Sequence, residues 1–351
     1  MMKKRVGIVT IISKNYGNRL QNYALQTILE RLNVEVETVP ISKKEQAKML
    51  LKILMHPFFK NRKWEWDEFN YKYIHWGKYN HTNIKLPDRY HYFIAGSDQI
   101  WNPFFYFNSE REFLVFAPPE KRIAYAASIG LYELPDLQTK YKYTTYWKEF
   151  KMISVREAAA AQIIRAAVDM EVPVVLDPTM LLPADEWNRL SECSKIKPGS
   201  KFVVCYFFEE LDCGIFDVIS KYAKYIGAEL IDIKPESIYK GYQIGPVEFL
   251  YLIQHSAYVF TNSFHGTALS IVFKRPFLVF HRKEQKGTGD MTSRIDTVLG
   301  MFGLKARYIK EGMDIGAILK DRMDYSEIEL RMRDKRAEAL DFLKHALELE
   351  E

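Results

Sequence analysis

The sequence has little cysteine and no long hydrophobic run. Only three cysteines occur among its 351 residues: Cys193, Cys205 and Cys213. They form no CxxC pair, which argues against a disulfide scaffold or a thiolate metal site and fits a reducing, cytoplasmic environment. No apolar stretch approaches the roughly 18 residues that span a bilayer. The first apolar run, Val6–Ile12, is too short for a signal peptide, so we interpret it as a first β-strand.

Several catalytic signatures are missing as well. The sequence contains no HExxH, no aspartate-rich metal motif, no GxSxG nucleophile elbow and neither GxGxxG nor the phosphate loop GxxxxGK[ST]. Metal-dependent and acyl-enzyme chemistry therefore lose support, and we expect no metal and no cofactor. The 50 basic and 45 acidic residues are interspersed, so the net charge of +5 does not imply nucleic acid.

Length and pattern favour two α/β domains. A chain of 351 residues exceeds what one hydrophobic core usually supports. Short apolar runs alternate with helical patterns, which is typical of βαβ units and parallel sheets. The predicted strands are Val6–Ile12, Val34–Val39, Tyr92–Ala95, Ile123–Ala126, Met152–Val155, Val172–Leu176, Phe202–Phe207, Glu229–Ile233, Tyr258–Thr261 and Phe277–Phe280. The predicted helices are Leu20–Leu32, Glu157–Val168, Cys213–Ile226, Pro246–His255 and His265–Phe273.

We predict a first Rossmann-like domain over residues 1–185, a second over 200–323, and a C-terminal helix over 324–351 that packs back across the domain junction. The polar, proline-containing segment Leu182–Ser200 is the predicted linker. Two doubly wound domains that face a cleft form a GT-B-like architecture, in which ligands bind beyond the carboxyl ends of the strands. Residues 43–90 form a helical insertion whose segment His56–Lys78 is rich in aromatic and basic side chains. It either packs its aromatics on its own domain, which is the favoured alternative, or rests on an anionic membrane or a sugar.

The segment 259–268 places polar residues directly between a buried strand and a helix. The N–H groups of Gly266 and Thr267 would lack partners at the helix start, so they and the hydroxyl of Ser263 could receive a phosphate or carboxylate. His265 lies at this point too, and histidine is the side-chain type that ordinarily transfers protons near neutral pH. The alternative is a helix cap by Ser263 beside a structural histidine.

Arg156 follows another predicted strand. Its planar guanidinium suits a carboxylate or phosphate, and Glu157 either caps the next helix or orients Arg156. A salt-bridged structural arginine is the alternative. Three basic residues around a glycine-containing loop either close over an anion or are simply solvated: Lys283, Lys286 and Arg294.

Two further strand ends carry side chains that suit a sugar. In the loop after the first strand, Gly17 permits close backbone approach to a ligand. The loop after residues 92–95 offers a carboxylate and amides for hydroxyl groups and an indole face for the apolar side of a ring, or it is a turn with a buried tryptophan. The candidate acceptor-binding residues are Asn15, Gly17, Asn18, Gln21, Ser97, Asp98, Gln99, Trp101 and Asn102.

Seven short motifs follow one another along the chain. They are Asn15-x-Gly-Asn-x-x-Gln21, Gly96-Ser-Asp-Gln-Ile-Trp-Asn102, Ala127-Ser-Ile-Gly130, Ser154-Val-Arg-Glu157, Asp177-Pro-Thr179, Pro246-x-x-Phe-Leu250 and Thr261-Asn-Ser-Phe-His-Gly-Thr267. Together, over about residues 5–305, they resemble the bacterial polysaccharide pyruvyl transferase family. The Ser-Phe-His-Gly and Gly-Ser-Asp-Gln-x-Trp-Asn elements are the most specific of them.

The resemblance implies a GT-B-like fold and the transfer of enolpyruvate from phosphoenolpyruvate to two hydroxyls of one sugar, which forms a cyclic ketal and releases phosphate. It maps the family's important histidine to His265 and an important arginine to Arg156, with Asp98 a weaker catalytic candidate on the acceptor. Lys286 is preferred over Lys283 as the later basic residue. The acceptor is expected on the first domain and the donor on the second. The candidate donor-binding residues are Arg156, Ser263, Gly266, Thr267, Lys286 and Arg294.

Two alternatives stay open at this point. One is a GT-B glycosyltransferase that uses a nucleotide sugar, and the other is a non-catalytic glycan-binding protein. The expected partners are phosphoenolpyruvate and a saccharide acceptor. If the acceptor is lipid-linked, the protein would work at the inner face of the cytoplasmic membrane. The sequence names neither the acceptor sugar nor the bridged hydroxyls, and it does not set the oligomeric state.

Overall fold

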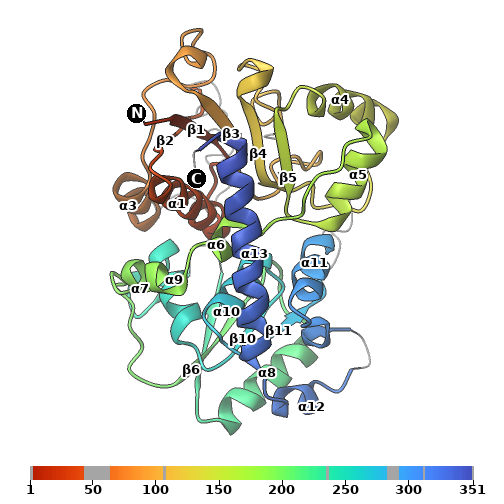
Figure 1. Ribbon diagram of the computed structural model, residues 1–351. Helices are drawn as coiled ribbons and strands as arrows, with labels where there is room; N and C mark the ends of the chain where they lie inside the picture. Colours follow the sequence, from red (N-terminus) through yellow and green to blue (C-terminus); the bar gives the residue numbers. More distant parts are fainter. Residues whose placement is uncertain are drawn as a thin grey trace. The chain divides into compact units, whose positions relative to one another are not determined.

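The chain folds into two compact units, each built around a parallel sheet (Figure 1). The computed structural model describes residues 3–42, 64–105, 108–234, 237–282, 292–310 and 313–349. Unit 1 comprises Met1–Leu181 and Glu338–Glu351, and unit 2 comprises Leu182–Ala337.

The sheet of unit 1 has five parallel strands in the order β2-β1-β3-β4-β5. Its strands are β1 (Arg5–Val9), β2 (Glu35–Thr38), β3 (Tyr92–Ala95), β4 (Arg122–Ala127) and β5 (Met152–Val155). The prediction of a sixth strand at Val172–Leu176 is wrong, because Val174 forms only an isolated bridge with Val155. Pro173 in this segment has no N–H to donate, so a continuous ladder cannot form.

Helices α1 (Tyr16–Arg31), α3 (Trp64–Tyr73), α4 (Leu137–Trp147), α5 (Ala158–Val168) and α6 (Pro178–Leu181) complete unit 1. Asn15 caps α1, since its Oδ1 accepts hydrogen bonds from the N–H groups of Gly17 and Asn18. The cap fixes the point at which the chain turns from β1 into α1.

Helix α3 belongs to the predicted insertion and packs on its own unit. Trp66 and Phe69 are buried. Trp66 stacks on Tyr16 of α1 with ring centroids 5.0 Å apart, and Phe69 meets Tyr23 edge to face at 6.3 Å. Trp66 and Phe69 thus serve the core of unit 1, whereas Tyr71 is exposed. Residues 56–63 of the aromatic segment lie outside the described residues.

The sheet of unit 2 has the order β12-β11-β10-β6-β7, and all of its pairings are parallel. Counted in chain order within each unit, both sheets have the strand order 2-1-3-4-5. The order reverses between β1 and β3 in unit 1 and between β6 and β10 in unit 2. Such switch points are where open α/β sheets bind ligands. The strands are β6 (Phe202–Tyr206), β7 (Glu229–Ile233), β10 (Val259–Thr261), β11 (Phe277–Phe280) and β12 (Tyr308–Ile309), with a separate hairpin of β8 (Ile238–Tyr239) and β9 (Tyr242–Gln243).

The segment predicted as a linker begins unit 2 and contains a helix. Pro183 occupies the N-cap position of α7, so this proline starts a helix where we predicted a connection. The unit boundary accordingly falls after Leu181. The helices that begin in unit 2 are α7 (Ala184–Ser191), α8 (Cys213–Tyr225), α9 (Pro246–His255), α10 (Phe264–Val272), α11 (Ser293–Met301), α12 (Ile315–Lys320) and α13 (Tyr325–Ala346).

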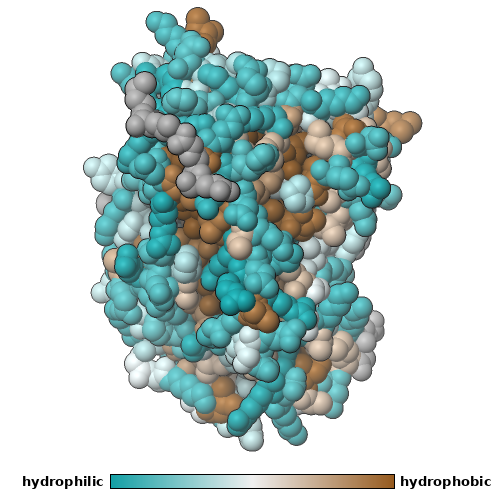
Figure 2. Space-filling view, viewed as in Figure 1, coloured by the Kyte–Doolittle hydropathy of each residue, from teal (hydrophilic) through white to brown (hydrophobic). Residues whose placement is uncertain are grey.

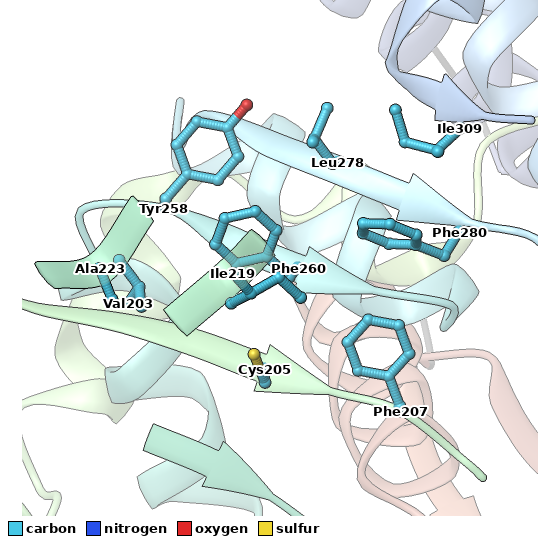
Figure 3. Close-up of a cluster of buried hydrophobic side chains, with 10 residues drawn as sticks. All are labelled: Val203, Cys205, Phe207, Ile219, Ala223, Tyr258, Phe260, Leu278, Phe280 and Ile309. Carbon is cyan, nitrogen blue, oxygen red and sulfur yellow. The ribbon is translucent and has the colours of Figure 1, made fainter. Parts of the chain in front are cut away.

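One face of the second sheet is closed by a hydrophobic cluster (Figure 3). Phe207 and Phe280 lie at the carboxyl ends of β6 and β11, and their ring centroids are 5.6 Å apart. Because β10 lies between these two strands, the aromatic contact holds the strand ends on both sides of it. The remaining members of the cluster are Val203, Cys205, Ile219, Ala223, Tyr258, Phe260, Leu278 and Ile309.

The face of the molecule in Figure 2 is mainly hydrophilic, with hydrophobic residues in scattered groups. Within the described part of the chain, no helix combines the length and the apolar character needed to cross a bilayer.

Helix α13 is continuous; it begins in unit 2 and ends in unit 1 (Figure 1). Its end is fastened to the first sheet by Glu348, which accepts hydrogen bonds from Lys151 Nζ at 2.6 Å and from the Tyr92 hydroxyl at 2.7 Å. Lys151 also donates to the carbonyl of Ala346. The bonds from Lys151 and Tyr92 lower the pKa of Glu348 to about 2.

We expect Trp66→Ala to lower the free energy of unfolding by about 3–5 kcal/mol, because a buried aromatic is lost from the contact between α1 and α3. The matched control is Tyr71→Ala on the same helix, since Tyr71 is 91% exposed and its loss should change stability by no more than about 0.5 kcal/mol. Urea unfolding of both variants measures the difference. Equal effects would contradict the packing of this insertion.

We expect the ionisation of Glu348 to make the stability of the fold depend on pH in the acid range. Its pKa falls from 4.5 to about 2 on folding, so its contribution is complete above pH 4.5 and is lost as the pH falls toward 2. Wild type should therefore melt at a higher temperature than Glu348→Gln at pH 7, and the two should converge in the acid range. The exposed Asp341→Asn is the control on α13. A melting difference that persists unchanged down to pH 2 would count against this fastening.

Candidate functional site

Asp177 is the centre of a buried polar network at the carboxyl edge of the first sheet. Its side chain is 0% exposed and pairs with Arg156 Nη1 at 2.7 Å. It also accepts hydrogen bonds from Ser97 Oγ at 2.6 Å and from the N–H and hydroxyl of Thr179 at 2.9 and 2.6 Å. The network joins the loops that follow β3 and β5 to the start of α6.

Asp98 extends this network to the first helix. Asn18 and the N–H of Gln99 donate to its two carboxylate oxygens, and Arg156 Nη2 lies 3.4 Å from Oδ1. Its φ of +75° lies in the left-handed region, where a non-glycine residue persists only if its surroundings hold it. Asp98 is therefore held in one position at the switch point between β1 and β3.

The positive charge of Arg156 is fully neutralised. Burial lowers its pKa, but Asp177, Asp98 and Glu157 outweigh burial, and the net shift is upward. The side chain is 1% exposed, so the salt-bridged alternative describes this residue. A donor anion could reach Arg156 only in competition with two aspartates that already hold it.

Glu157 anchors the neighbouring loop and forms no capping hydrogen bond on α5. Its Oε1 accepts from Ser128 Oγ and from the N–H groups of Ile129 and Gly130, at 2.8 to 3.0 Å. Gly130 has a φ of +78°, and a Cβ there would lie 2.1 Å from the Gln99 amide nitrogen. Glycine at this position lets the loop pack directly against Gln99.

Two buried arginines in this region were not predicted from the sequence. Arg19 donates to the carbonyl of Ile11 at 2.5 Å, and burial lowers its pKa to about 10 although Asp98 opposes the shift. Arg111 pairs with Glu112 at 2.7 Å. Helical spacing could have indicated that Arg19 faces inward, but its partner could not be found from local sequence.

The other acceptor candidates have structural partners. Asn15 and Gly17 form the capped start of α1, and Gln21 donates to Thr10 Oγ1 at 2.6 Å. Trp101 is 0% exposed and stacks on Phe113 with centroids 5.6 Å apart. The prediction that its indole faces a sugar is therefore wrong. Asn102 is likewise buried, and its Oδ1 accepts from the N–H of Phe104.

In unit 2 the start of α10 uses its polar groups internally. Ser263 is the N-cap, and its Oγ accepts from the N–H of Gly266 at 3.3 Å. The N–H and the hydroxyl of Thr267 both donate to the carbonyl of Ser263, at 3.0 and 2.9 Å. The expectation that Gly266 and Thr267 offer free donors to a phosphate is wrong, because the cap already satisfies them.

His265 occupies the first turn of α10 and is 5% exposed. The next residue packs closely on β10, since a Cβ on Gly266 would lie 2.7 Å from Thr261 Oγ1. Glycine at this position therefore sets the distance between α10 and the strand, and with it the place of the imidazole. The helix start, with His265, lies at the switch point of unit 2.

A second polar cluster at this switch point was missed by the sequence analysis. Asn262 accepts from the N–H of Phe208 at 3.1 Å and donates to Glu209 at 3.1 Å. Arg282, which follows β11, lies over the Phe208 ring at 4.7 Å and 3.9 Å from Glu209. Its position beside Lys283 in the sequence was the only available signal.

Of the remaining donor-binding candidates, one lies in the described part of the chain and two do not. Arg294 is 8% exposed and lies in the first turn of α11. Lys283 and Lys286 lie outside the described residues. Among the described residues, no three His, Cys, Asp or Glu side chains gather as metal ligands.

Comparison with known proteins settles the family. The sequence profile of the family described as "Polysaccharide pyruvyl transferase" matches residues 15–283, which include both switch-point clusters. The chain belongs to the polysaccharide pyruvyl transferase family. It is a transferase, as the motifs predict. No curated protein matches the sequence.

Solved structures confirm the GT-B-like α/β fold of this family member. A candidate UDP-N-acetylglucosamine 2-epimerase from Listeria monocytogenes is 12% identical, with 100% of this chain and 98% of that chain covered and a TM-score of 0.53. The UDP-N-acetylglucosamine 2-epimerase of Methanocaldococcus jannaschii is 12% identical, with 95% and 94% covered and a TM-score of 0.51. At this identity the likeness shows the fold alone.

We expect Asp177→Asn to lower the free energy of unfolding by about 3–5 kcal/mol, because it leaves Arg156 buried with one partner fewer. Glu171→Gln is the matched control. It breaks the Arg165–Glu171 pair, whose side chains are 66% and 76% exposed, and should cost no more than about 1 kcal/mol. Denaturant unfolding compares them. A loss for Asp177→Asn as small as that of the control would contradict the central place of this ion pair.

Proposed function

We propose that this transferase moves the enolpyruvyl group of phosphoenolpyruvate onto two hydroxyls of one sugar in a cell-surface polysaccharide or its precursor. The product is a pyruvate ketal, and phosphate is released. The observation that carries the proposal is the family match over residues 15–283. His265 at the start of α10 and the fixed carboxylate of Asp98 are consistent with it.

His265 is the proposed proton donor. Its place at a helix start on a strand end puts an imidazole where a bound anion would meet it. Neutral pH suits an imidazole that must donate and accept protons within one turnover. The reaction needs both steps, since the methylene of the donor is protonated and the hydroxyls of the acceptor lose protons.

The steps balance without a redox change. A proton adds to the methylene carbon of phosphoenolpyruvate, which becomes a methyl group, and a sugar hydroxyl forms a bond to the adjacent cationic carbon as it loses its proton. The carbon–oxygen bond to phosphate then breaks. The second hydroxyl attacks the same carbon and loses its proton, which closes the ketal. Phosphoenolpyruvate is a substrate, and the proposal requires no cofactor.

We assign the acceptor to the switch point of unit 1. Asp98 is held there by Asn18 and Arg156, so its carboxylate has a fixed place from which to accept a hydroxyl proton. Arg156 is then a positioning residue, because both of its outer nitrogens are bound to aspartates. An acceptor on a lipid carrier would bring the protein to the inner face of the cytoplasmic membrane.

We expect His265→Asn to keep binding phosphoenolpyruvate but to lose about 10²- to 10⁴-fold in turnover. His255→Gln, at the end of α9 in the same unit, is the control and should retain activity. Binding is measured by the rise in melting temperature with phosphoenolpyruvate. Turnover is measured by phosphate release and by the mass gain of a panel of saccharide acceptors.

Stabilisation of wild type by a nucleotide sugar but not by phosphoenolpyruvate would overturn the proposal in favour of a glycosyltransferase. Saccharide binding without any turnover, unchanged in His265→Asn, would instead point to a glycan-binding protein.

A further inference from the structure

A phosphorylated donor that docks on unit 2 requires positive charge, and the start of α10 does not supply the expected donors. The N–H groups of Gly266 and Thr267 are bonded to Ser263. These two groups are therefore not available to a phosphate, which would gain affinity from a side-chain cation at this switch point. Arg282 is a cation beside it that neither the motifs nor the roles assigned above have used.

Arg282 reaches across the end of β10. It follows β11, yet it contacts Phe208 and Glu209, which follow β6. In the sheet β10 lies between these strands, and Asn262 at its end is bonded to Phe208 and Glu209. The guanidinium therefore lies beside the loop from which α10 and His265 begin.

The charge of Arg282 is incompletely balanced. Its Nε is buried and forms no hydrogen bond with any of the described residues, and the 3.9 Å to Glu209 Oε2 exceeds hydrogen-bond length. Burial lowers the pKa of Arg282, and Glu209 offsets this only in part. Arg156 shows the opposite case, because its two aspartates raise its pKa despite complete burial.

The charges around Glu209 indicate the side from which an anion can approach Arg282. A cavity of about 330 Å³ there is lined by four carboxylates and one lysine, together with Phe207, Leu211, Cys213 and Phe216; the charged residues are Glu209, Glu210, Asp217, Asp232 and Lys234. This negative lining repels a phosphate. The favourable approach to the cluster is on the side of the arginine.

We propose that Arg282 is an anion-binding residue of unit 2 that takes a phosphate or carboxylate at the switch point between β6 and β10, with Glu209 as the counter-ion that the anion displaces. The identity of the anion as phosphoenolpyruvate rests on the proposed function. The guanidinium offers a planar pair of donors to either group. Asn262 holds Glu209 in place when the anion is absent.

Removal of the two charges should change affinity in opposite directions. We expect Arg282→Ala to weaken phosphoenolpyruvate binding by about 10- to 100-fold, the range for hydrogen bonds to charged groups, and Arg282→Lys to weaken it less. Glu209→Gln should tighten binding by about threefold to tenfold, because the competing carboxylate is gone. Titration calorimetry with phosphoenolpyruvate and with inorganic phosphate measures both effects.

Two controls repeat the Glu→Gln and Arg→Lys substitutions at residues outside the contact between Arg282 and Glu209. Glu210→Gln alters the exposed neighbour of Glu209, and Arg275→Lys alters the arginine at the amino end of β11, whose Nε donates to the carbonyl of Phe273. Arg275→Lys should bind as wild type does, and Glu210→Gln, which removes one carboxylate from the cavity lining, should change affinity less than Glu209→Gln does. If Arg282→Ala does not fold, Arg282→Lys and Glu209→Gln still test the opposite signs.

The outcomes separate this inference from the proposed function. If Arg282 variants bind phosphoenolpyruvate as wild type does while wild type turns it over, the function stands and the inference falls. If wild type binds inorganic phosphate or a nucleoside diphosphate through Arg282 but does not bind phosphoenolpyruvate, the anion site stands and the function falls. Wild type that binds none of these anions would overturn both.

Discussion

The buried ion pair between Arg156 and Asp177 is the interaction on which the first switch point depends. Through Ser97, Asp98 and Asn18 it connects the loops after β3 and β5 with helix α1. A buried pair of this kind adds little net stability, but either charge left alone would be strongly unfavourable. The ion pair therefore determines position more than stability. The loops after β3 and β5 and helix α1 can pack only in an arrangement that keeps these charges paired, and that arrangement fixes the place of Asp98.

The second switch point has the same strand order and a different chemistry. Its helix start is closed by neutral hydrogen bonds within the chain, which Gly266 and Thr267 donate to Ser263. The cation at this switch point is Arg282. Its Nε lies 3.9 Å from the carboxylate of Glu209, which is beyond hydrogen-bond distance. The buried charges at the first edge are thus paired at close range, whereas at the second edge the guanidinium of Arg282 has no carboxylate within hydrogen-bond distance of its Nε. This difference suits a transferase that binds a saccharide acceptor and a separate donor substrate.

The secondary structure was predictable wherever an apolar run is bounded by polar residues. Tyr92–Ala95, Met152–Val155, Glu229–Ile233 and Phe277–Phe280 have the predicted limits. Tyr92–Ala95 and Phe277–Phe280 are buried and apolar along their whole length, as strands inside a parallel sheet usually are. Helices α4 and α11 were not predicted, and two further errors involve proline. In Val172–Leu176 the apolar pattern is correct, but Pro173 cannot donate to a ladder. At Pro183 the same residue type begins a helix, and a sequence pattern alone does not distinguish that role from a linker.

By itself, the sequence determined the two βαβ halves, the position of polar motifs at the ends of β1, β3, β4, β5 and β10, and the family. These depend on periodicity and on short motifs, which are local properties of the chain. Only the tertiary structure decided which partner each side chain has. It buried Trp101 against Phe113, neutralised Arg156 and brought Arg282 to Glu209. The physical reason is that burial and hydrogen bonding depend on neighbours in space, and these residues meet their partners only when the strands and loops pack together.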